Sequence, residues 1–282
     1  MNSRKGITGM SIAEHGWASL EQENPEAMTD GALALSLAWH AGRRLSQVRA
    51  ELMGLGTGAA DLKDAGDSAA QEVLARLLRL HRPDDAVLSE EAVDDAARLL
   101  ADRVWVIDPL DGTREFSEEG RIDWAVHVAL WERGDLVAGA VVLPAAELGY
   151  GTEVPVPVPA FSGGRLRLAV SRTRPPAFVQ QVAARLEAEL VPMGSAGVKA
   201  TSVLRGEADA YLHAGGQYEW DSAAPVAVAR AAGLHTSRID GSPLLYNQRD
   251  VLLPDLLVCR NEHADTLLAA VAAVTDEARG TS

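Results

Sequence analysis

The stretch that decides the fold is WVIDPLDGTREF, residues 105–116. Its apolar start predicts a buried strand, and that strand runs straight into two carboxylates, Asp108 and Asp111. In an extended strand, side chains three positions apart face opposite ways. Here Pro109 fixes one backbone dihedral and Gly112 relaxes another, so a turn can bring both carboxylates to one point. The stretch therefore predicts a strand that ends in a paired acidic site.

Two carboxylates at one point offer the hard oxygen donors that Mg²⁺ prefers. The backbone carbonyl of Leu110 stands between them in the sequence and could add a third donor. If a helix begins after Asp111, the free N–H groups of Gly112 and Thr113 face an anion. An ordinary turn explains the same residues, because Asp-Pro and Asp-Gly are common turn pairs and Asp is a common N-cap. The stretch alone leaves both interpretations open.

Further acids stand at the ends of other predicted elements. Glu90 and Glu91 end a short strand predicted from AVLSEEA. Asp67 opens a helix predicted at 67–81, and Asp221 stands at the start of an Ala-rich helix. Each acid alone is typical of a solvated helix cap. Taken together, they predict a carboxylate site that holds more than one metal ion.

The order of the predicted elements divides the chain into two halves. The stretch TEVPVPVPA at 152–160 is too rich in proline for a central strand, so we place the boundary there. We expect a loose arm at 1–26, a metal-binding α+β domain at 27–155 and an α/β domain at 156–282 that completes the substrate site. Helical periodicity predicts helices at 28–53, 67–81, 175–190, 198–206, 220–233 and 263–278.

Composition limits the class of protein. The chain has 282 residues, 47% of them hydrophobic, and a formal net charge of −14, which argues against nucleic acid as a partner. Its single cysteine, Cys259, excludes an intrachain disulfide and suits a reducing compartment. The N-terminal residues show no apolar signal-peptide core, and no apolar run is long enough to span a membrane. We therefore expect a soluble cytoplasmic protein with no membrane partner.

DPLDGT at 108–113 resembles the signature of the Mg²⁺-dependent, lithium-sensitive phosphatases of the inositol monophosphatase superfamily. A second signature of that family, Trp-Asp followed by a small-residue helix, resembles YEWDSAAPVAVARAAG at 218–233. LSEE at 88–91 is similar to the upstream acidic motif, and GSAGVK at 194–199 to the substrate loop. The resemblance runs from about residue 30 to 275. It implies a layered αβαβα sandwich with the site where the two halves meet.

The resemblance also implies roles for individual residues. Asp67 matches the acid that helps to position a nucleophilic water, and Thr113 would activate that water or bind the phosphate with the Gly112 N–H. Two metal ions can lower the pKa of a bound water and neutralise the leaving oxygen. The chain departs from the family at Asp64, where relatives carry Thr, which leaves the roles of Asp64 and Lys63 open. The implied ligands of two or three Mg²⁺ are Glu90, Asp108, the Leu110 carbonyl, Asp111 and Asp221.

The residues after the signature bear on the substrate. Simple inositol monophosphatases tend to continue with Thr-Asn-Phe, whereas Arg114-Glu115-Phe116 resembles the 3′(2′),5′-bisphosphate nucleotidases of the CysQ type, in an actinobacterial form. That resemblance implies removal of the 3′-phosphate of adenosine 3′,5′-bisphosphate, a by-product of sulfate activation in sulfate assimilation. The second phosphate requires a cationic anchor away from the metals. The candidate substrate-binding residues are Asp111, Gly112, Thr113, Ser171, Arg172, Gly194, Ser195, Lys199 and Asp221.

Several alternatives stay open at this point. The same metal chemistry would act on inositol 1-phosphate or fructose 1,6-bisphosphate. A haloacid-dehalogenase phosphatase has one residue between its two Asp, whereas this chain has two. A metal-binding or nucleotide-binding regulator without turnover is a further hypothesis. Many relatives are dimers, so a homodimer is a further expectation, although the sequence shows no dimer face. The seven histidines, His127 among them, show no ligand spacing, and we interpret most of the seven as caps or surface residues.

Overall fold

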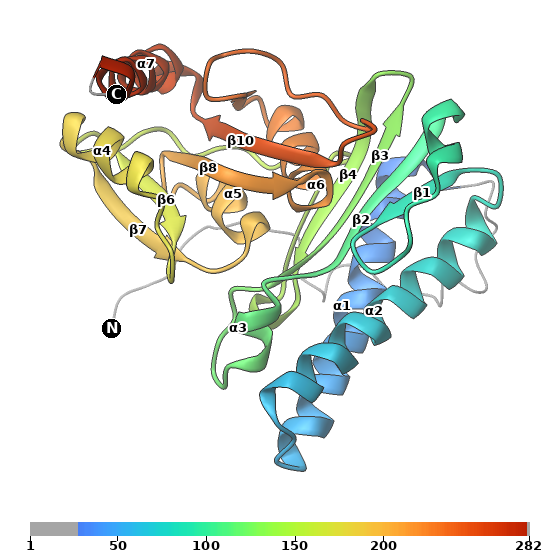
Figure 1. Ribbon diagram of the computed structural model, residues 1–282. Coiled ribbons are helices and arrows are strands. Elements are labelled where there is room, and N and C mark those ends of the chain that lie inside the picture. The colour runs from blue at the N-terminus through green and yellow to red at the C-terminus, as the bar shows by residue number, and fades with distance from the viewer. Residues whose placement is uncertain (1–27, 281–282) are drawn as a thin grey trace.

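The computed structural model describes residues 28–280, so the arm predicted at 1–26 lies outside the described residues. Two five-stranded sheets lie face to face with helices between them and on both outer sides (Figure 1). The elements of the first half are α1 (Asp30–Gly54), α2 (Ala59–His81), β1 (Ala86–Ser89), η4 (Ala96–Leu100), β2 (Arg103–Asp111), α3 (Thr113–Ser117), β3 (Ala125–Glu132), β4 (Asp135–Leu143), η5 (Pro144–Ala146) and β5 (Leu148–Gly151).

The first sheet has the strand order β1-β2-β3-β4-β5. β1 pairs with β2 in parallel, and the other neighbours are antiparallel. The apolar run of β2 is buried from Val104 onward because helices cover both faces of the sheet. α1 and α2 pack on the outer face through a core that includes Leu37, Leu74 and Trp105. The acidic end of β2 is therefore the exit of a strand that is fixed from both sides.

The second sheet has the strand order β7-β6-β8-β10-β9. β6 is parallel to β7 and β8, whereas β10 is antiparallel to β8 and β9. α4 and α7 pack on its outer face through Val182, Leu267 and their neighbours. The elements of this half are β6 (Arg167–Ser171), α4 (Ala177–Arg185), β7 (Glu189–Met193), α5 (Ala196–Leu204), β8 (Ala210–Tyr218), α6 (Glu219–Ala231), β9 (His235–Ser237), β10 (Leu252–Cys259), η6 (Asn261–His263) and α7 (Ala264–Gly280).

The middle layer consists of α5 and α6. α6 contacts β2, β3 and β4 of the first sheet and also β8, β9 and β10 of the second. One apolar core joins Val141 of the first sheet, Ala224 of α6 and Val258 of the second sheet. The layers are thus α1/α2, first sheet, α5/α6, second sheet, and α4/α7 (Figure 1). The predicted αβαβα sandwich is confirmed.

Two predicted elements were wrong at their ends. α2 begins at Ala59 rather than at residue 67, because Leu62 and Gly66 continue the buried face of the helix at intervals of four residues. Asp67 therefore lies inside α2 and does not open it. The helix predicted at 175–190 ends at Arg185, and residues 189–193 form the edge strand β7, which tolerates Pro192. Pairing with the exposed edge of β6 overrides the local helical pattern.

The change from one sheet to the other falls in residues 152–166, which contain the proline-rich stretch. The division into two domains there stays a prediction, and α6 of the second half packs on the sheet of the first. Within residues 28–280, no helix combines the length and the apolar character that a membrane crossing requires.

Candidate metal centre and active site

Three carboxylates from two elements converge at the end of β2. Asp108 and Asp111 come from β2, and Asp221 comes from the first turn of α6. One oxygen of each lies within 4.8 Å of the others. The pairing of β2 with β3 shifts register here: Asp108 faces His127 and Asp111 faces Ala125. The extra residue in β2 is a bulge, which allows both acids to turn toward the same point.

The Asp108 carboxylate fits a bound cation. It is 1% exposed, its Oδ1 accepts a hydrogen bond from Leu110 N at 3.0 Å, and its Oδ2 has no hydrogen-bond partner within residues 28–280. Burial first, and then the negative charges of Glu90 and Asp111, raise the pKa of Asp108 well above its usual value. A buried carboxylate is costly without a counter-charge. A divalent cation bound by hard oxygen donors would supply that charge.

Asp221, Glu90 and Asp67 are also shifted. Burial, with the charge of Asp111 next, raises the pKa of Asp221 to about 6. Glu90 follows β1, and loss of solvent around its carboxyl, followed by the charge of Asp221, raises its pKa to about 7. Burial, followed by the charges of Glu91 and Asp64, raises the pKa of Asp67 to about 7. Glu90 thus stands beside the three converging carboxylates, whereas the charges that act on Asp67 are those of Glu91, Asp64 and Lys63.

Asp111 differs from the other acids because it has donors. Burial alone would raise the pKa of Asp111, but the charges of His127 and Lys199 and a hydrogen bond from Ser195 lower it to about 2. Its Oδ2 accepts from Gly197 N at 2.7 Å and from the Ser195 hydroxyl, and lies 3.2 Å from His127 Nε2. None of these contacts uses Oδ1. Asp111 is therefore held ionised by the substrate loop while one oxygen stays available.

Sequence reasoning missed His127. The side chain is fully buried on β3, opposite Asp108, and its Nδ1 lies 3.2 Å from the carbonyl oxygen of Trp220. Strand alternation could have placed it on the inward face with Ala125 and Ala129, but the register against β2 is not readable from the sequence. A Cβ on Gly197 would collide with the ring of His127. α5 can approach this histidine only because residue 197 is glycine.

The chain turns directly after Asp111, at Gly112. Gly112 has φ +90°, a left-handed conformation that favours glycine, and the short helix α3 follows. The Leu110 carbonyl accepts from the Thr113 hydroxyl at 3.1 Å. A Cβ on Gly112 would lie 3.2 Å from Ser195 Cβ, so the turn packs closely against the substrate loop. Gly112, Thr113 and Ser195 are thus brought to the same place as Asp111.

Arg49 of α1 holds the segment that follows this turn. No sequence motif marked this arginine as a site residue. Its guanidinium donates to three backbone carbonyls, those of Phe116 at 2.8 Å, Glu118 at 2.6 Å and Arg121 at 2.9 Å. It also lies 5.8 Å from the ring centroid of Phe116 and 5.7 Å from that of Trp124. A planar guanidinium suits several acceptors at fixed angles. The segment that follows the signature is therefore held through its backbone.

Arg172, a candidate anchor for a second phosphate, contacts the same segment. Arg172 donates to Glu115 Oε1 at 2.9 Å and to Glu118 Oε2 at 2.9 Å, so the structure shows it already ion-paired. Ser171 accepts from Arg174 N at 3.2 Å. The charge of Arg172 is therefore already balanced by carboxylates of α3 and of the residue that follows it.

The substrate loop is held from inside. Lys199 is buried, and its Nζ donates to the carbonyls of Gly194, at 3.3 Å, and Ser195. It lies 5.3 Å from the ring centroid of Tyr211, and burial lowers its pKa. Gly194 N donates to Asp123 Oδ2 at 2.7 Å. Lys199 thus supports the loop rather than facing solvent.

A model of the inositol monophosphatase family matches residues 26–276. The chain belongs to this family. The match covers α1, both sheets, α5 and α6, so every acid described above lies within it. It also removes the basis for the haloacid-dehalogenase alternative.

Two relatives carry names that describe an activity. A 3′-phosphoadenosine 5′-phosphate phosphatase of Mycobacterium bovis is 55% identical over 240 residues, which cover 82% of this chain and 89% of the relative. The 3′(2′),5′-bisphosphate nucleotidase CysQ of Escherichia coli K12 is 34% identical over 200 residues, covering 67% and 81%. The solved CysQ of Bacteroides thetaiotaomicron, a member of the same family, superposes with a TM-score of 0.69 at 26% identity, covering 80% and 95%. The predicted family and its CysQ-type resemblance are confirmed.

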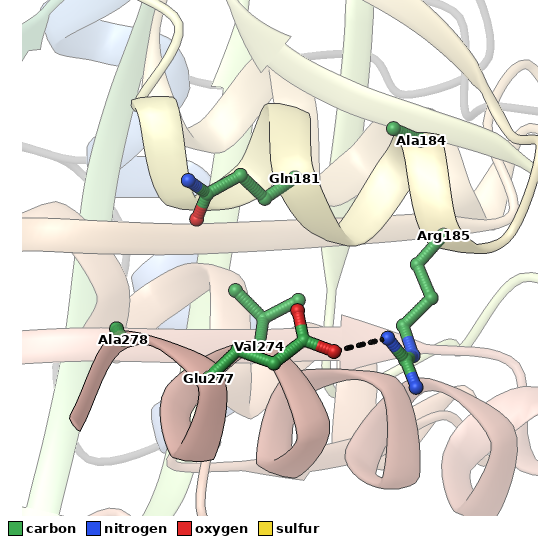
Figure 2. A pocket seen from close by; sticks show the side chains of 6 residues that line it. All are labelled: Gln181, Ala184, Arg185, Val274, Glu277 and Ala278. Atoms are coloured by element: carbon green, nitrogen blue, oxygen red, sulfur yellow. Dashed lines mark hydrogen bonds and ion pairs between the residues drawn. The ribbon is translucent and has the colours of Figure 1, made fainter. Parts of the chain in front are cut away.

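A separate surface pocket lies away from these acids. Figure 2 shows side chains of α4 and α7 that line it. The pocket has a volume of about 400 Å³. Arg185 Nη1 and Glu277 Oε1 form an ion pair of 2.7 Å across it. It belongs to the outer helical layer of the second sheet, whereas the acids lie where β2 meets α6. We therefore assign it no part in the site.

Proposed function

We propose that the chain is a Mg²⁺-dependent phosphatase that converts adenosine 3′,5′-bisphosphate to AMP and phosphate. The observation that carries the proposal is the convergence of Asp108, Asp111 and Asp221. Among the described residues, the buried Oδ2 of Asp108 has no hydrogen-bond partner. The names of the Mycobacterium bovis and Escherichia coli relatives support the choice of substrate. In this proposal, two or three Mg²⁺ are held by the three aspartates, Glu90 and the Leu110 carbonyl.

The cations, when bound, lower the pKa of a water molecule and neutralise charge on the leaving oxygen. Side chains and backbone groups of the chain transfer the proton and bind the phosphate. Asp67 accepts a proton from the attacking water, because its pKa of about 7 suits proton transfer at neutral pH. Thr113 holds the 3′-phosphate together with the Gly112 N–H. A new P–O bond forms to the water oxygen, the bond to the ribose 3′-oxygen breaks, and that oxygen takes up a proton from solvent.

The 5′-phosphate distinguishes this substrate from a simple monophosphate. In our proposal, it binds Arg172 beside α3, and Ser171 lines the same side. The Glu118 side chain is 40% exposed and can leave Arg172 more easily than the Glu115 side chain, which is 8% exposed. The incoming phosphate therefore replaces Glu118, and Glu115 keeps Arg172 in place. Lys199, Gly194 and Ser195 contribute through the loop that they form.

The test compares phosphate release from adenosine 3′,5′-bisphosphate, inositol 1-phosphate and fructose 1,6-bisphosphate, each with Mg²⁺ and with EDTA. We expect kcat/KM for the nucleotide to exceed the others by about tenfold or more, at least about 1.4 kcal/mol of transition-state preference. EDTA should abolish release from all three. If inositol phosphate wins, the metal site stands, but our interpretation of Arg114-Glu115-Phe116 and of Arg172 is wrong. If none is hydrolysed with Mg²⁺, the phosphatase proposal fails.

The expected homodimer stays a prediction. Sedimentation equilibrium of the full chain measures it directly, and a single species with the mass of one chain, 29.9 kDa, would contradict it.

A further inference from the structure

A buried polar chain outside the acid cluster joins the loop after β1 to the start of α6. Arg98 lies on η4, which follows Glu90, and its side chain is 1% exposed. Glu219 is the first residue of α6 and is also 1% exposed. Neither residue forms a hydrogen bond with Asp108, Asp111 or Asp221 within residues 28–280. Two charged groups are therefore buried with no part in the chemistry proposed above.

Arg98 uses its whole guanidinium. Nε and Nη2 donate to the two carboxylate oxygens of Asp94 at 2.6 and 3.0 Å. Nη1 donates to Asn247 Oδ1 at 2.6 Å, and Nη2 also donates to the carbonyl of Gln248 at 2.9 Å. Asn247 Nδ2 donates in return to the carbonyl of Arg98 at 3.3 Å. The arginine thus joins its own loop, through Asp94, to a loop 149 residues away in sequence.

Glu219 holds the same distant loop from the other side. Its Oε2 accepts from Asn247 N at 2.6 Å, and its Oε1 accepts from Gln248 N at 2.7 Å. Asn247 has φ +59°, a left-handed conformation that Asn tolerates better than most residues. Asn247 therefore stands between a buried arginine and a buried glutamate. We name Arg98, Asn247 and Glu219 together the Arg98 latch.

The latch joins two segments that each lie next to a predicted metal ligand, Glu90 in one and Asp221 in the other. Glu219 is two residues before Asp221, and Asp94 is four residues after Glu90. The charge of Asp221 acts directly on Glu90. On its other side, Glu90 is tied to β2, because its N–H donates to the carbonyl of Ile107 at 3.4 Å. The latch thus connects the loop after Glu90 to the start of α6, which carries Asp221.

We propose that the Arg98 latch is a positioning group for the metal centre, which holds the Glu90 loop against α6 so that the ligand set is formed before cations bind. The inference rests on the metal site of the proposed function. Partners of this kind, one step removed from the ligands, orient them and affect metal affinity by about 10–100-fold. Arg98 touches neither substrate nor cation in this proposal and acts only through Asp94, Asn247 and Glu219.

The test titrates Mg²⁺ into the metal-free full chain by calorimetry, without substrate. Arg98→Lys keeps the charge but loses the planar fork that reaches Asp94, Asn247 and Gln248 together. We expect its Mg²⁺ Kd to rise by about 10–100-fold, while kcat at saturating Mg²⁺ stays close to that of the unaltered chain. The matched control is Arg103→Lys, which disturbs ion pairs with Asp30, Asp85 and Glu132 at the opposite end of β2. It should lower Tm and leave the Mg²⁺ Kd unchanged.

A second variant covers the case in which Arg98→Lys does not fold. Asn247→Gly accepts the same backbone conformation and removes only the amide that meets Arg98. It should weaken Mg²⁺ binding in the same direction. If either folded variant binds Mg²⁺ as the unaltered chain does, the latch is only structural and the inference is overturned. If the unaltered chain binds no Mg²⁺, the proposed function fails with it, which is a different and separable result.

Discussion

Burial and the neighbouring acids disfavour the charged form of Asp108 and raise its pKa. We therefore expect Asp108→Asn to stabilise the metal-free chain by about 1 kcal/mol, as removal of strained functional groups often does. Its phosphatase activity with Mg²⁺ should fall by about 10³-fold or more, because the cations supply several kcal/mol of transition-state stabilisation. Thermal unfolding in EDTA and phosphate release measure the two effects.

Asp209 provides the contrast for that experiment. It is also fully buried, but it is ion-paired with Arg167 at 2.9 Å and with Arg260 at 3.4 Å, and these partners outweigh its burial and lower its pKa. Asp209→Asn should therefore destabilise the chain under the same conditions. A fall in Tm for both variants would contradict our account of Asp108.

The raised pKa values of Asp67 and Glu90, both about 7, and of Asp221, about 6, make a prediction about pH. Between pH 4 and pH 7 the folded chain holds protons that the unfolded chain has already lost. The free energy of unfolding in EDTA should therefore decrease as pH rises through this window. Mg²⁺ should oppose the decrease, so the gap in Tm between Mg²⁺ and EDTA widens from pH 5 to pH 8. A gap that narrows with rising pH would show that Glu90 and Asp221 are not ligands of the cation.

At the scale of the element, α2 is brought close to the signature by a glycine. A Cβ on Gly66 would lie 2.7 Å from Phe116 Cε1 and 3.0 Å from Leu110 Cδ2. Gly66→Ala should destabilise the chain by about 1–3 kcal/mol through overpacking, although the same change usually favours a helix. Because Asp67 is the next residue, kcat should fall as well. Denaturant unfolding and steady-state kinetics measure both.

Gly54, the last residue of α1, is the matched control. A Cβ there meets nothing within 4 Å. Gly54→Ala should stabilise the chain by about 0.4–1 kcal/mol and leave kcat unchanged. If Gly66→Ala and Gly54→Ala change the free energy of unfolding and kcat equally, α2 does not contact the signature as described.

The sequence predicted those elements whose local pattern and tertiary role agree. β2 begins as an unbroken apolar run, and α1 begins at Asp30, within two residues of its predicted start. The predicted start of α2 was wrong because Gly66 weakens a helix locally, whereas close packing against Phe116 and Leu110 requires a glycine there. β7 was missed because only pairing with β6 makes those residues a strand. His127 was missed for a similar reason, since its contact with Asp111 lies beyond a bulge in β2 that the sequence does not reveal.

At the scale of the whole molecule, the site depends on the middle layer. α6 carries Asp221 and packs on both sheets, so the half before residue 156 exposes an apolar sheet face without it. We expect a single cooperative unfolding transition. Five of the six Trp precede residue 156, so Trp fluorescence reports mainly the first half. Far-UV circular dichroism reports both halves, and the two midpoints should coincide. Two separate midpoints would mean that the halves unfold independently, as isolated domains.

Short local motifs contain the three acids that converge in the structure. The three converging acids come from two short signatures, and each signature sits at the end of a strand or the start of a helix. Local sequence is therefore sufficient to mark these three aspartates as candidate ligands. The supporting side chains, Arg49, His127 and the Arg98 latch, are spread over distant positions. Only the layered packing brings them to the site, and no local pattern marks them.

The way in which Arg49 holds the segment after the signature has a consequence for how new specificities can arise. Its three hydrogen bonds all go to backbone carbonyls, which every amino acid offers. The side chains at 114, 117 and 119 can therefore change by mutation without loss of that support. Related proteins can therefore differ in the side chains next to the acidic site. The segment stays attached to α1 in each of them, because Arg49 binds its backbone and not its side chains.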